Sequence, residues 1–256
     1  MKVVLLAGGL GSRIAEETIV RPKPMVEIGH RPILWHIMQH YSHFGHREFI
    51  VCLGYKGEQI KRYFADSLAL GADVTIDFAT NSVEVLDTPR DDWRVTLVDT
   101  GQWTQTAGRL SRVQSLVGDE PFLMTYGDGV SDVDLDALLE FHRGTGRLAT
   151  ITAVRPPARF GKLTVNDGQV THFDEKPQMS EGWINGGFFV LEPAVFDFIP
   201  GDVDFAREPL ESLADAGELS GFCHDGFWQC MDTARDRDLL NSLWDSGHPP
   251  WKMWNS

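Results

Sequence analysis

Cysteine is scarce in this sequence. The 256 residues include three cysteines, Cys52, Cys223 and Cys230, and no two of them form a Cys-x-x-Cys pair. The pattern therefore excludes a disulfide framework and the usual spacing of a zinc site, and it favours a reducing cytoplasm. We expect Cys230 to be a buried structural thiol.

Long apolar runs are missing as well. The apolar run at residues 3–7 is far shorter than the core of a secretory signal. No stretch approaches the ~20 apolar residues that a membrane span needs. We therefore expect a cytoplasmic protein with no membrane partner.

Positive charge is in deficit, because the formal net charge is −14 with histidine counted as neutral. Nucleic-acid binding needs a basic face for the phosphates, so we expect no nucleic-acid partner. A small ligand that carries phosphate must then be held by a local group of cations.

The sequence does contain a regular alternation of strand and helix patterns. Apolar strand-like segments lie at 2–7, 48–54, 94–101, 121–129 and 148–154, and helical patterns lie at 31–45, 56–66, 108–118 and 134–144. This alternation predicts the α/β class, with a mainly parallel sheet covered by helices on both faces. The chain length is compatible with one domain.

The pattern changes after residue 154. Residues 161–177 predict a hairpin around an Asn-Asp-Gly turn, and residues 184–199 predict a strand followed by a helix. Residues 207–219 and 233–247 predict two further helices. The aromatic tail, with Trp251 and Trp254, must dock on this chain or on a neighbouring subunit.

The stretch "LLAGGLGSRIAEETIVRPKPM" (5–25) joins the first strand to three glycines and then to Arg13 and Lys23. It is not a P-loop, because no Gly-Lys-Ser/Thr follows the glycines. The dinucleotide fingerprint also fails, because Ile14 stands at the third glycine position and two later prolines prevent a long helix. We therefore predict a long irregular loop at 10–23. Its glycines let backbone N–H groups approach phosphates, and its separated cations suit a chain of phosphates.

Two aspartates lie at the boundaries of predicted elements. Asp128, in "TYGDGVSD", comes just after a strand, where open α/β sheets bind ligands and where a carboxylate can hold Mg²⁺. The alternative for Asp128 is a simple Asp-Gly turn. Asp232, in "FWQCMDTARD", precedes a helix, and its alternative is a helix N-cap.

Three histidines, His36, His40 and His43, lie on one face of the predicted helix at 31–45. This face points roughly away from the apolar stripe of that helix. A zinc protease would need Glu directly after His36, and that Glu is absent. We therefore expect a solvated face rather than a metal site.

Taken together, these segments resemble the sugar-1-phosphate nucleotidyltransferase family, and most closely its cytidylyl-transferring branch. The resemblance spans nearly the whole chain, at residues 2–254, with Ser12 where many members have Thr. It is carried by "LLAGGLGSR", "RPKPMVEIG", "RPILWHIM", "VTLVDTG", "TAGRL", "TYGDGV", "RFG", "EKP", "INGGFFV" and "FWQCMDTARD". Ala107 stands where this branch more often has Gly, which bears on base selectivity, and Cys230 stands where it often has Pro.

The resemblance implies a Rossmann-like nucleotidyltransferase core with small β and helical additions, Mg²⁺ as cofactor and a homo-oligomer. The implied reaction is CTP with α-D-glucose 1-phosphate, giving CDP-glucose and pyrophosphate, in deoxysugar or O-antigen biosynthesis. It also implies a single domain, 1–256. Within it, 1–130 would be mainly nucleotide-binding, 131–232 mainly sugar-phosphate-binding, and 233–256 a C-terminal helix and aromatic tail.

The resemblance also assigns roles to matching positions. It implies catalytic roles for Arg13, Lys23 and Asp128, and metal ligation by Asp128 and Asp232. The implied nucleotide-binding positions are Leu6, Ala7, Gly8, Gly9, Gly11, Ser12, Arg13, Lys23, Thr106, Arg109, Tyr126, Gly127 and Asp128. The implied positions for the sugar-phosphate substrate are Tyr126, Gly161, Glu175, Lys176, Asn185 and Gly186.

The implied reaction needs no general base, because the attacking sugar-phosphate oxygen is already an anion. The difficulty is to bring two anions together, which positioning and cations solve. We expect Arg13 to stabilise the leaving pyrophosphate, Lys23 the α-phosphate and Lys176 the sugar phosphate. Main-chain carbonyls at 6–9 are candidates to accept from the cytosine amine, and Arg109 is a candidate for the base oxygen.

Two other functions remain open. One is the same chemistry with UTP or dTTP, or with another hexose 1-phosphate. "TAGRL" stands in place of the glutamine-bearing segment typical of thymidylyl members, which argues against dTTP. The other is a catalytically silent protein that binds a nucleotide or sugar phosphate. The presence of both Asp128 and Asp232 argues against it, since a pure binder has no need of both.

Overall fold

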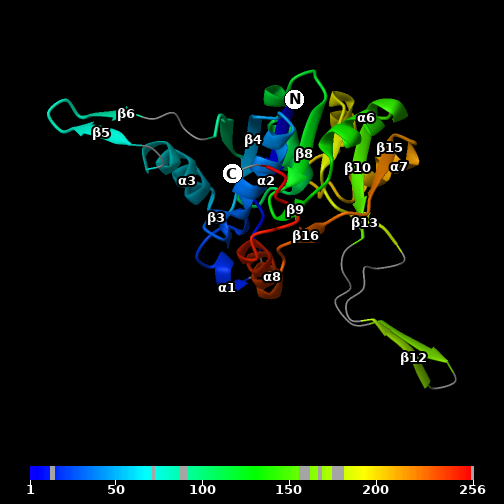
Figure 1. The fold of residues 1–256 in the computed structure, drawn as a ribbon. Helices are drawn as coiled ribbons and strands as arrows, with labels where there is room; N and C mark the ends of the chain where they lie inside the picture. The colour runs from blue at the N-terminus through cyan, green and yellow to red at the C-terminus, as the bar shows by residue number, and fades with distance from the viewer. Residues whose placement is uncertain are drawn as a thin grey trace.

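A mixed sheet of eight strands forms the centre of the protein (Figure 1). The structure is a computed structural model that describes residues 1–11, 15–70, 73–86, 91–155, 162–166, 169–174 and 182–254. The strands of the sheet are β1 (Lys2–Leu6), β4 (Glu48–Leu53), β7 (Arg94–Asp99), β8 (Phe122–Tyr126), β10 (Ala149–Val154), β13 (Ile184–Asn185), β14 (Phe189–Leu191) and β15 (Leu219–His224).

The direction of the strands changes across this sheet. Strands β7, β4, β1 and β8 are neighbours in that order, and each adjacent pair is parallel. Strand β14 lies antiparallel between β8 and β10, and β15 pairs with β10 in parallel. This arrangement confirms the predicted mixed, mainly parallel sheet, and it brings the carboxyl ends of β1, β4 and β8 to one edge.

The remaining elements cover the sheet or extend from it. The helices are α1 (Ala15–Thr18), α2 (Ile33–His43), α3 (Gly57–Leu70), α4 (Thr106–Arg112), α5 (Gln114–Val117), α6 (Leu135–Thr145), α7 (Glu208–Asp215) and α8 (Ala234–Asp245), with 3₁₀ turns η2 (Lys23–Met25) and η3 (Pro193–Phe198). The two-stranded pairs are β2 (Glu27–Ile28) with β3 (Arg31–Pro32), β5 (Val74–Asp77) with β6 (Ser82–Val85), β11 (Lys162–Asn166) with β12 (Gln169–Asp174), and β9 (Gly129–Ser131) with β16 (Trp228–Cys230).

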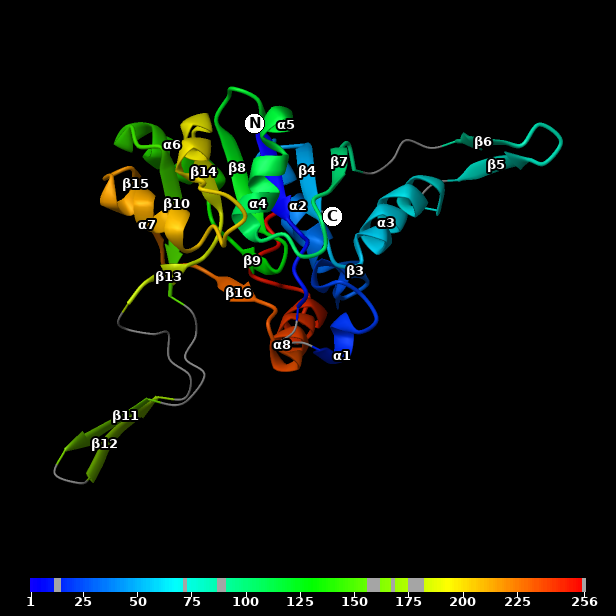
Figure 2. The same cartoon turned by 180° about the vertical axis from the view of Figure 1, so that it is seen from behind.

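Side-chain alternation along β1 explains why helices cover both faces. Val3 and Leu5 join a core with α2, α6 and α8, whereas Val4 and Leu6 join a second core with α4 and α7. Successive residues of a strand point to opposite faces, so a strand with four consecutive apolar residues needs apolar cover on both faces. The helices that α/β crossovers place on the two faces provide this cover, as the views from both sides show (Figures 1 and 2).

The histidine face of α2 is buried, so the expectation of a solvated face is wrong for His36 and His40. Their exposed fractions are 0% and 2%, while His43 is exposed. Ring nitrogen Nε2 of His36 lies 3.0 Å from the Ile28 carbonyl, and Trp251 Nε1 donates to His36 Nδ1 at 3.4 Å. Burial lowers the pKa of His36 to about 4, so this histidine is neutral at physiological pH.

The aromatic tail docks on its own chain and covers His36. Trp251 has an exposed fraction of 0% and stacks with Trp244 of α8 and with Phe227. Trp254 makes an edge contact with Trp35 on α2. Trp251 and Trp254 therefore complete the core around α2.

Several elements differ from the sequence-based expectation. The pairs β5–β6 and β9–β16 and the strand β15 were not predicted, and the β5–β6 and β11–β12 hairpins project from the body (Figure 1). The predicted irregular loop at 10–23 contains the short helix α1. Helix α4 begins at Thr106, two residues before the predicted start at residue 108.

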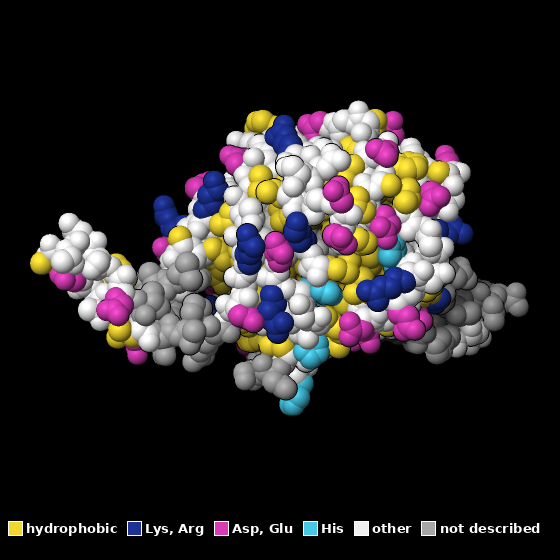
Figure 3. All heavy atoms as spheres, turned by 90° about the horizontal axis from the view of Figure 1, so that it is seen from above, with side chains coloured by type: hydrophobic (Ala, Val, Ile, Leu, Met, Phe, Trp, Pro, Cys, Tyr) yellow, Lys and Arg dark blue, Asp and Glu magenta, His cyan; other side chains and the backbone are white. Residues whose placement is uncertain are grey.

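The surface carries both signs of charge. Acidic and basic side chains are interspersed on the face seen from above (Figure 3). Among the described residues, every helix is too short or too polar to span a bilayer.

We predict that Trp251→Ala destabilises the fold by about 3–5 kcal/mol, because it opens a large cavity and removes a hydrogen bond to His36. The measurement is the free energy of unfolding in urea. Trp103→Ala is the matched control, since Trp103 is 74% exposed and its loss is expected to change stability by less than about 0.5 kcal/mol. Equal effects of the two substitutions would contradict the docking of the tail.

Candidate active site

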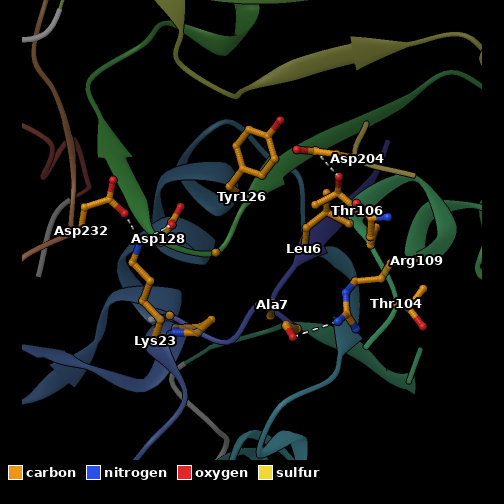
Figure 4. A pocket seen from close by; sticks show the side chains of 16 residues that line it. Leu6, Ala7, Lys23, Thr104, Thr106, Arg109, Tyr126, Asp128, Asp204 and Asp232 are labelled. Atoms are coloured by element: carbon orange, nitrogen blue, oxygen red, sulfur yellow. Dashed lines mark hydrogen bonds and ion pairs between the residues drawn. The ribbon is translucent and has the colours of Figure 1, made fainter. Parts of the chain in front are cut away.

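A pocket of ≈ 410 Å³ opens at the sheet edge where β1 and β8 end (Figure 4). The Gly127 N–H donates to the Leu6 carbonyl at 3.1 Å, which joins the segments that follow these two strands. The residues that line the pocket are Leu6, Ala7, Gly8, Gly9, Gly11, Lys23, Pro24, Thr104, Gln105, Thr106, Arg109, Tyr126, Gly127, Asp128, Asp204 and Asp232. The structure thus gathers twelve of the residues predicted from sequence around one pocket.

Two glycines of the opening loop are required by their surroundings. A Cβ at Gly8 would collide with the Arg109 guanidinium. Gly11 has a φ of +63° and lies against Thr18 and Lys23, so both its backbone conformation and the available space exclude a side chain. The loop can therefore follow this path only with glycine at these positions.

One end of the pocket holds a cation between two carboxylates. Lys23 Nζ donates to Asp128 Oδ2 at 2.6 Å and to Asp232 Oδ1 at 2.5 Å. Burial opposes the charge on Lys23, yet Asp128 and Asp232 raise its pKa above the ordinary value, so the lysine is an ammonium ion. The side chains of Lys23 and Asp232 are 11% and 16% exposed, whereas that of Asp128 is 32% exposed.

Backbone contacts fix the positions of these two carboxylates, which lie about a hundred residues apart in the sequence. Strand β9, which follows Asp128, pairs with β16, which precedes Asp232, and the Met231 N–H donates to the Asp128 carbonyl at 2.8 Å. A capping box of Thr233 and Asp236 begins α8, and the Asp232 N–H donates to Asp236 at 3.1 Å. Thr233 is therefore the N-cap, which leaves the Asp232 side chain to face the pocket.

Arg109 lies in the wall at the other end of the pocket and is 3% exposed. Its terminal nitrogens donate to main-chain carbonyls of Gly8 at 2.9 Å, Leu53 at 2.9 Å and Gly101 at 2.8 Å, and to the Thr100 hydroxyl at 2.8 Å. Burial lowers its pKa. Arg109 thus links the chain segments that follow β1, β4 and β7, and its role in reading a base stays a prediction.

The same contacts bear on which main-chain carbonyl could accept a hydrogen bond from the cytosine amine. The Gly8 carbonyl accepts from both Arg109 and the Tyr55 N–H, so both of its lone pairs have donors. The Leu6 carbonyl accepts from Gly127. Of the predicted carbonyls, Gly8 is therefore the least suited to accept a further hydrogen bond.

Two predicted sugar-phosphate positions, Asn185 and Gly186, lie beside the pocket rather than on its lining. Asn185 Nδ2 donates to the Tyr126 hydroxyl at 3.3 Å, and Trp228 Nε1 donates to the Gly186 carbonyl at 2.7 Å. Burial, partly offset by the bond from Asn185, raises the pKa of Tyr126 to about 12. These contacts join β8, β13 and β16 next to the carboxylate pair.

Sequence reasoning missed Pro24, Thr104, Gln105 and Asp204 in the lining. Asp204 accepts from the Thr106 hydroxyl at 2.8 Å across nearly a hundred residues, so only the tertiary fold could reveal it. The predicted residues Ser12, Arg13, Gly161, Glu175 and Lys176 lie outside the described residues. Burial and the nearby carboxylates raise the pKa of Cys230 to about 12, which suits an unreactive thiol.

The fold is an α/β fold with a polar pocket at one edge of its sheet, and comparison with known proteins gives the family. The family model described as nucleotidyl transferase matches residues 2–241. The glucose-1-phosphate cytidylyltransferase of Salmonella typhimurium is 55% identical over 256 residues, which cover 99% of this chain and 100% of that protein. The chain therefore belongs to the nucleotidyl transferase family.

A more distant curated protein and a solved structure are also similar to this chain. The UTP–glucose-1-phosphate uridylyltransferase of Synechocystis is 29% identical over 229 residues, covering 85% of this chain and 56% of that protein. The crystal structure of HddC from Yersinia pseudotuberculosis superposes with a TM-score of 0.70 at 22% identity, covering 95% of this chain and 99% of that one. At 22% identity, this structural similarity establishes the fold alone.

We predict that Asp128→Asn lowers turnover at least ~10²-fold, the scale of a lost electrostatic contact at a reacting centre, while folding stays nearly intact. Folding is spared because the Asp128 side chain is partly exposed. Asp119→Asn, which removes an exposed carboxylate away from the pocket lining, is the control. Steady-state kinetics and thermal unfolding of both variants give the comparison, and turnover of Asp128→Asn within a few-fold of the parent would refute a catalytic role.

Proposed function

We propose that this protein transfers the cytidylyl group of CTP to α-D-glucose 1-phosphate and releases pyrophosphate. A phosphate oxygen of the sugar phosphate forms a bond to the α-phosphorus of CTP, and the bond from that phosphorus to the bridging oxygen of the β-phosphate breaks. The products are CDP-glucose and pyrophosphate, so atoms and charge balance without an added acid or base. Two observations support the proposal, namely the cation between two carboxylates in the pocket and the 55% identity over the whole chain.

The distribution of charge in the pocket suits this substrate pair. Lys23 lies against Gly11, and the glycine loop extends from there to Gly8 beside Arg109, so backbone without side chains lines the pocket where phosphate oxygens can approach it. Thr106, Arg109 and Asp204 lie at the other end, where polar groups can hold a base. Tyr126 lies between these ends and is fixed by Asn185, so it can orient the sugar phosphate.

The Asp128 and Asp232 carboxylates fit a divalent cation, because in this structure they converge on one positive charge, the Lys23 ammonium. Among the described residues, no group of three or more His, Cys, Asp or Glu side chains could hold a metal ion. Proteins usually bind Mg²⁺ through one or two carboxylates, and substrate phosphates complete the coordination. When bound there, Mg²⁺ would neutralise charge on the phosphates.

Charge pairing and alignment of the substrates would be carried out by residues of the chain. Lys23 would pair with the α-phosphate and so reduce the repulsion between two anionic substrates. The Gly8–Gly11 backbone would hold the triphosphate, and the walls of the pocket would align the attacking oxygen with the leaving group. Arg13, Glu175 and Lys176 keep the roles predicted for them from the sequence, and a cytoplasmic homo-oligomer also stays a prediction.

The proposed function predicts that CTP supports the fastest pyrophosphate release when glucose 1-phosphate is offered with each of ATP, GTP, CTP, UTP and dTTP. The expected margin in kcat/KM is at least ~10-fold, because a polar site rejects a base whose donors and acceptors do not match. A higher value with UTP would favour the uridylyl alternative. Release with none of the five would favour a silent binding protein.

A further inference from the structure

The position of the Lys23 ammonium in the structure differs from the position that the proposed function requires of it. In the structure its ammonium lies between Asp128 and Asp232, at 2.6 and 2.5 Å. In the proposed reaction the same two carboxylates hold a divalent cation and Lys23 pairs with the α-phosphate. The Lys23 ammonium occupies the point between the two carboxylates. A metal ion bound by the same two carboxylate oxygens would need that point, so the two cations exclude each other.

The backbone positions of the two aspartates do not depend on which cation is present. Asp128 is held through the β9–β16 pair and through the Met231 N–H, and Asp232 is held by its own N–H bond to Asp236. Two carboxylates fixed this closely would repel each other without a positive charge between them. The Lys23 ammonium therefore keeps both side chains turned toward one point.

The lysine side chain, in contrast, can move while its backbone stays fixed. Lys23 begins the 3₁₀ turn η2 directly after Pro22 and before Pro24, and its Cβ packs against Gly11. Four rotatable bonds separate that backbone from the ammonium. Gly11 lies directly against Lys23, so the ammonium can transfer from the carboxylates to a phosphate held by the loop near Gly11 without a change in the fold.

We propose that Lys23 is a place-holding cation for the carboxylate pair, and that nucleotide phosphate draws it away and so opens Asp128 and Asp232 to the divalent ion. The inference rests on the proposed function, because it takes these aspartates as the metal ligands. It gives an order of events in which the metal enters with the nucleotide or after it. Lys23 is then a positioning residue for the aspartates before it contacts substrate.

The test is the affinity of Mn²⁺ for the full-length protein, measured from the electron paramagnetic resonance signal of the free ion. Without nucleotide, Lys23→Met is expected to bind Mn²⁺ at least ~10-fold more tightly than the parent, within the range of typical coupling between two ligands. Lys23→Arg keeps the positive charge and is expected to bind as weakly as the parent. Equal affinities for the parent and Lys23→Met would overturn the proposal.

A second measurement uses only the parent protein, so it holds even where Lys23→Met folds poorly. Adding CMP, which supplies an α-phosphate, is expected to tighten Mn²⁺ binding to the parent at least ~5-fold. No effect of CMP on the parent would overturn the proposal.

A third measurement distinguishes a failure of this proposal from a failure of the proposed function on which it rests. Asp128→Asn in the Lys23→Met background is expected to abolish the tight Mn²⁺ site. If Mn²⁺ binds that double variant as tightly as Lys23→Met, the metal lies elsewhere and the assignment of the aspartates fails. If Mn²⁺ needs Asp128 but binds equally with and without Lys23, only the place-holding role fails.

Discussion

The contact of Lys23 with Asp128 and Asp232 is the interaction on which the rest of the pocket depends. It brings together residues from the beginning, middle and end of the chain. Two carboxylates and one ammonium leave a net negative charge, which can be balanced by a further cation but not by a phosphate alone. A site of this kind therefore binds anionic substrates only together with positive charge, and this requirement links the metal, the nucleotide and the lysine.

The sheet makes this contact possible. Because β1 and β8 are parallel neighbours, the glycine loop and Asp128 emerge at the same edge. The short β9–β16 pair then returns the distant Asp232 to that edge. Trp251 covers His36 and completes the core around α2, so the C-terminal segment contributes to the site through Asp232 and to stability through its aromatic tail.

Much of this could be predicted from the sequence, because it depends on local patterns. The apolar strand at 2–7 and the glycines after it predict β1 and its loop, and the position of Asp128 after a strand predicts its place at the sheet edge. His36 and Asp204 could not be predicted in this way. The periodicity of one helix shows which face is apolar, but not that Trp251 would cover His36, more than two hundred residues later. Asp204 is brought to the pocket by contacts of its segment with Thr106 and Ala107, more than ninety residues earlier in the sequence.

The most direct test of the metal assignment is anomalous diffraction from crystals grown with Mn²⁺ and a CTP analogue that cannot release pyrophosphate. The site described above predicts one manganese peak in contact with both Asp128 and Asp232, with the Lys23 ammonium moved onto the α-phosphate. A manganese peak that touches neither aspartate, with Lys23 still between the two carboxylates, would contradict it.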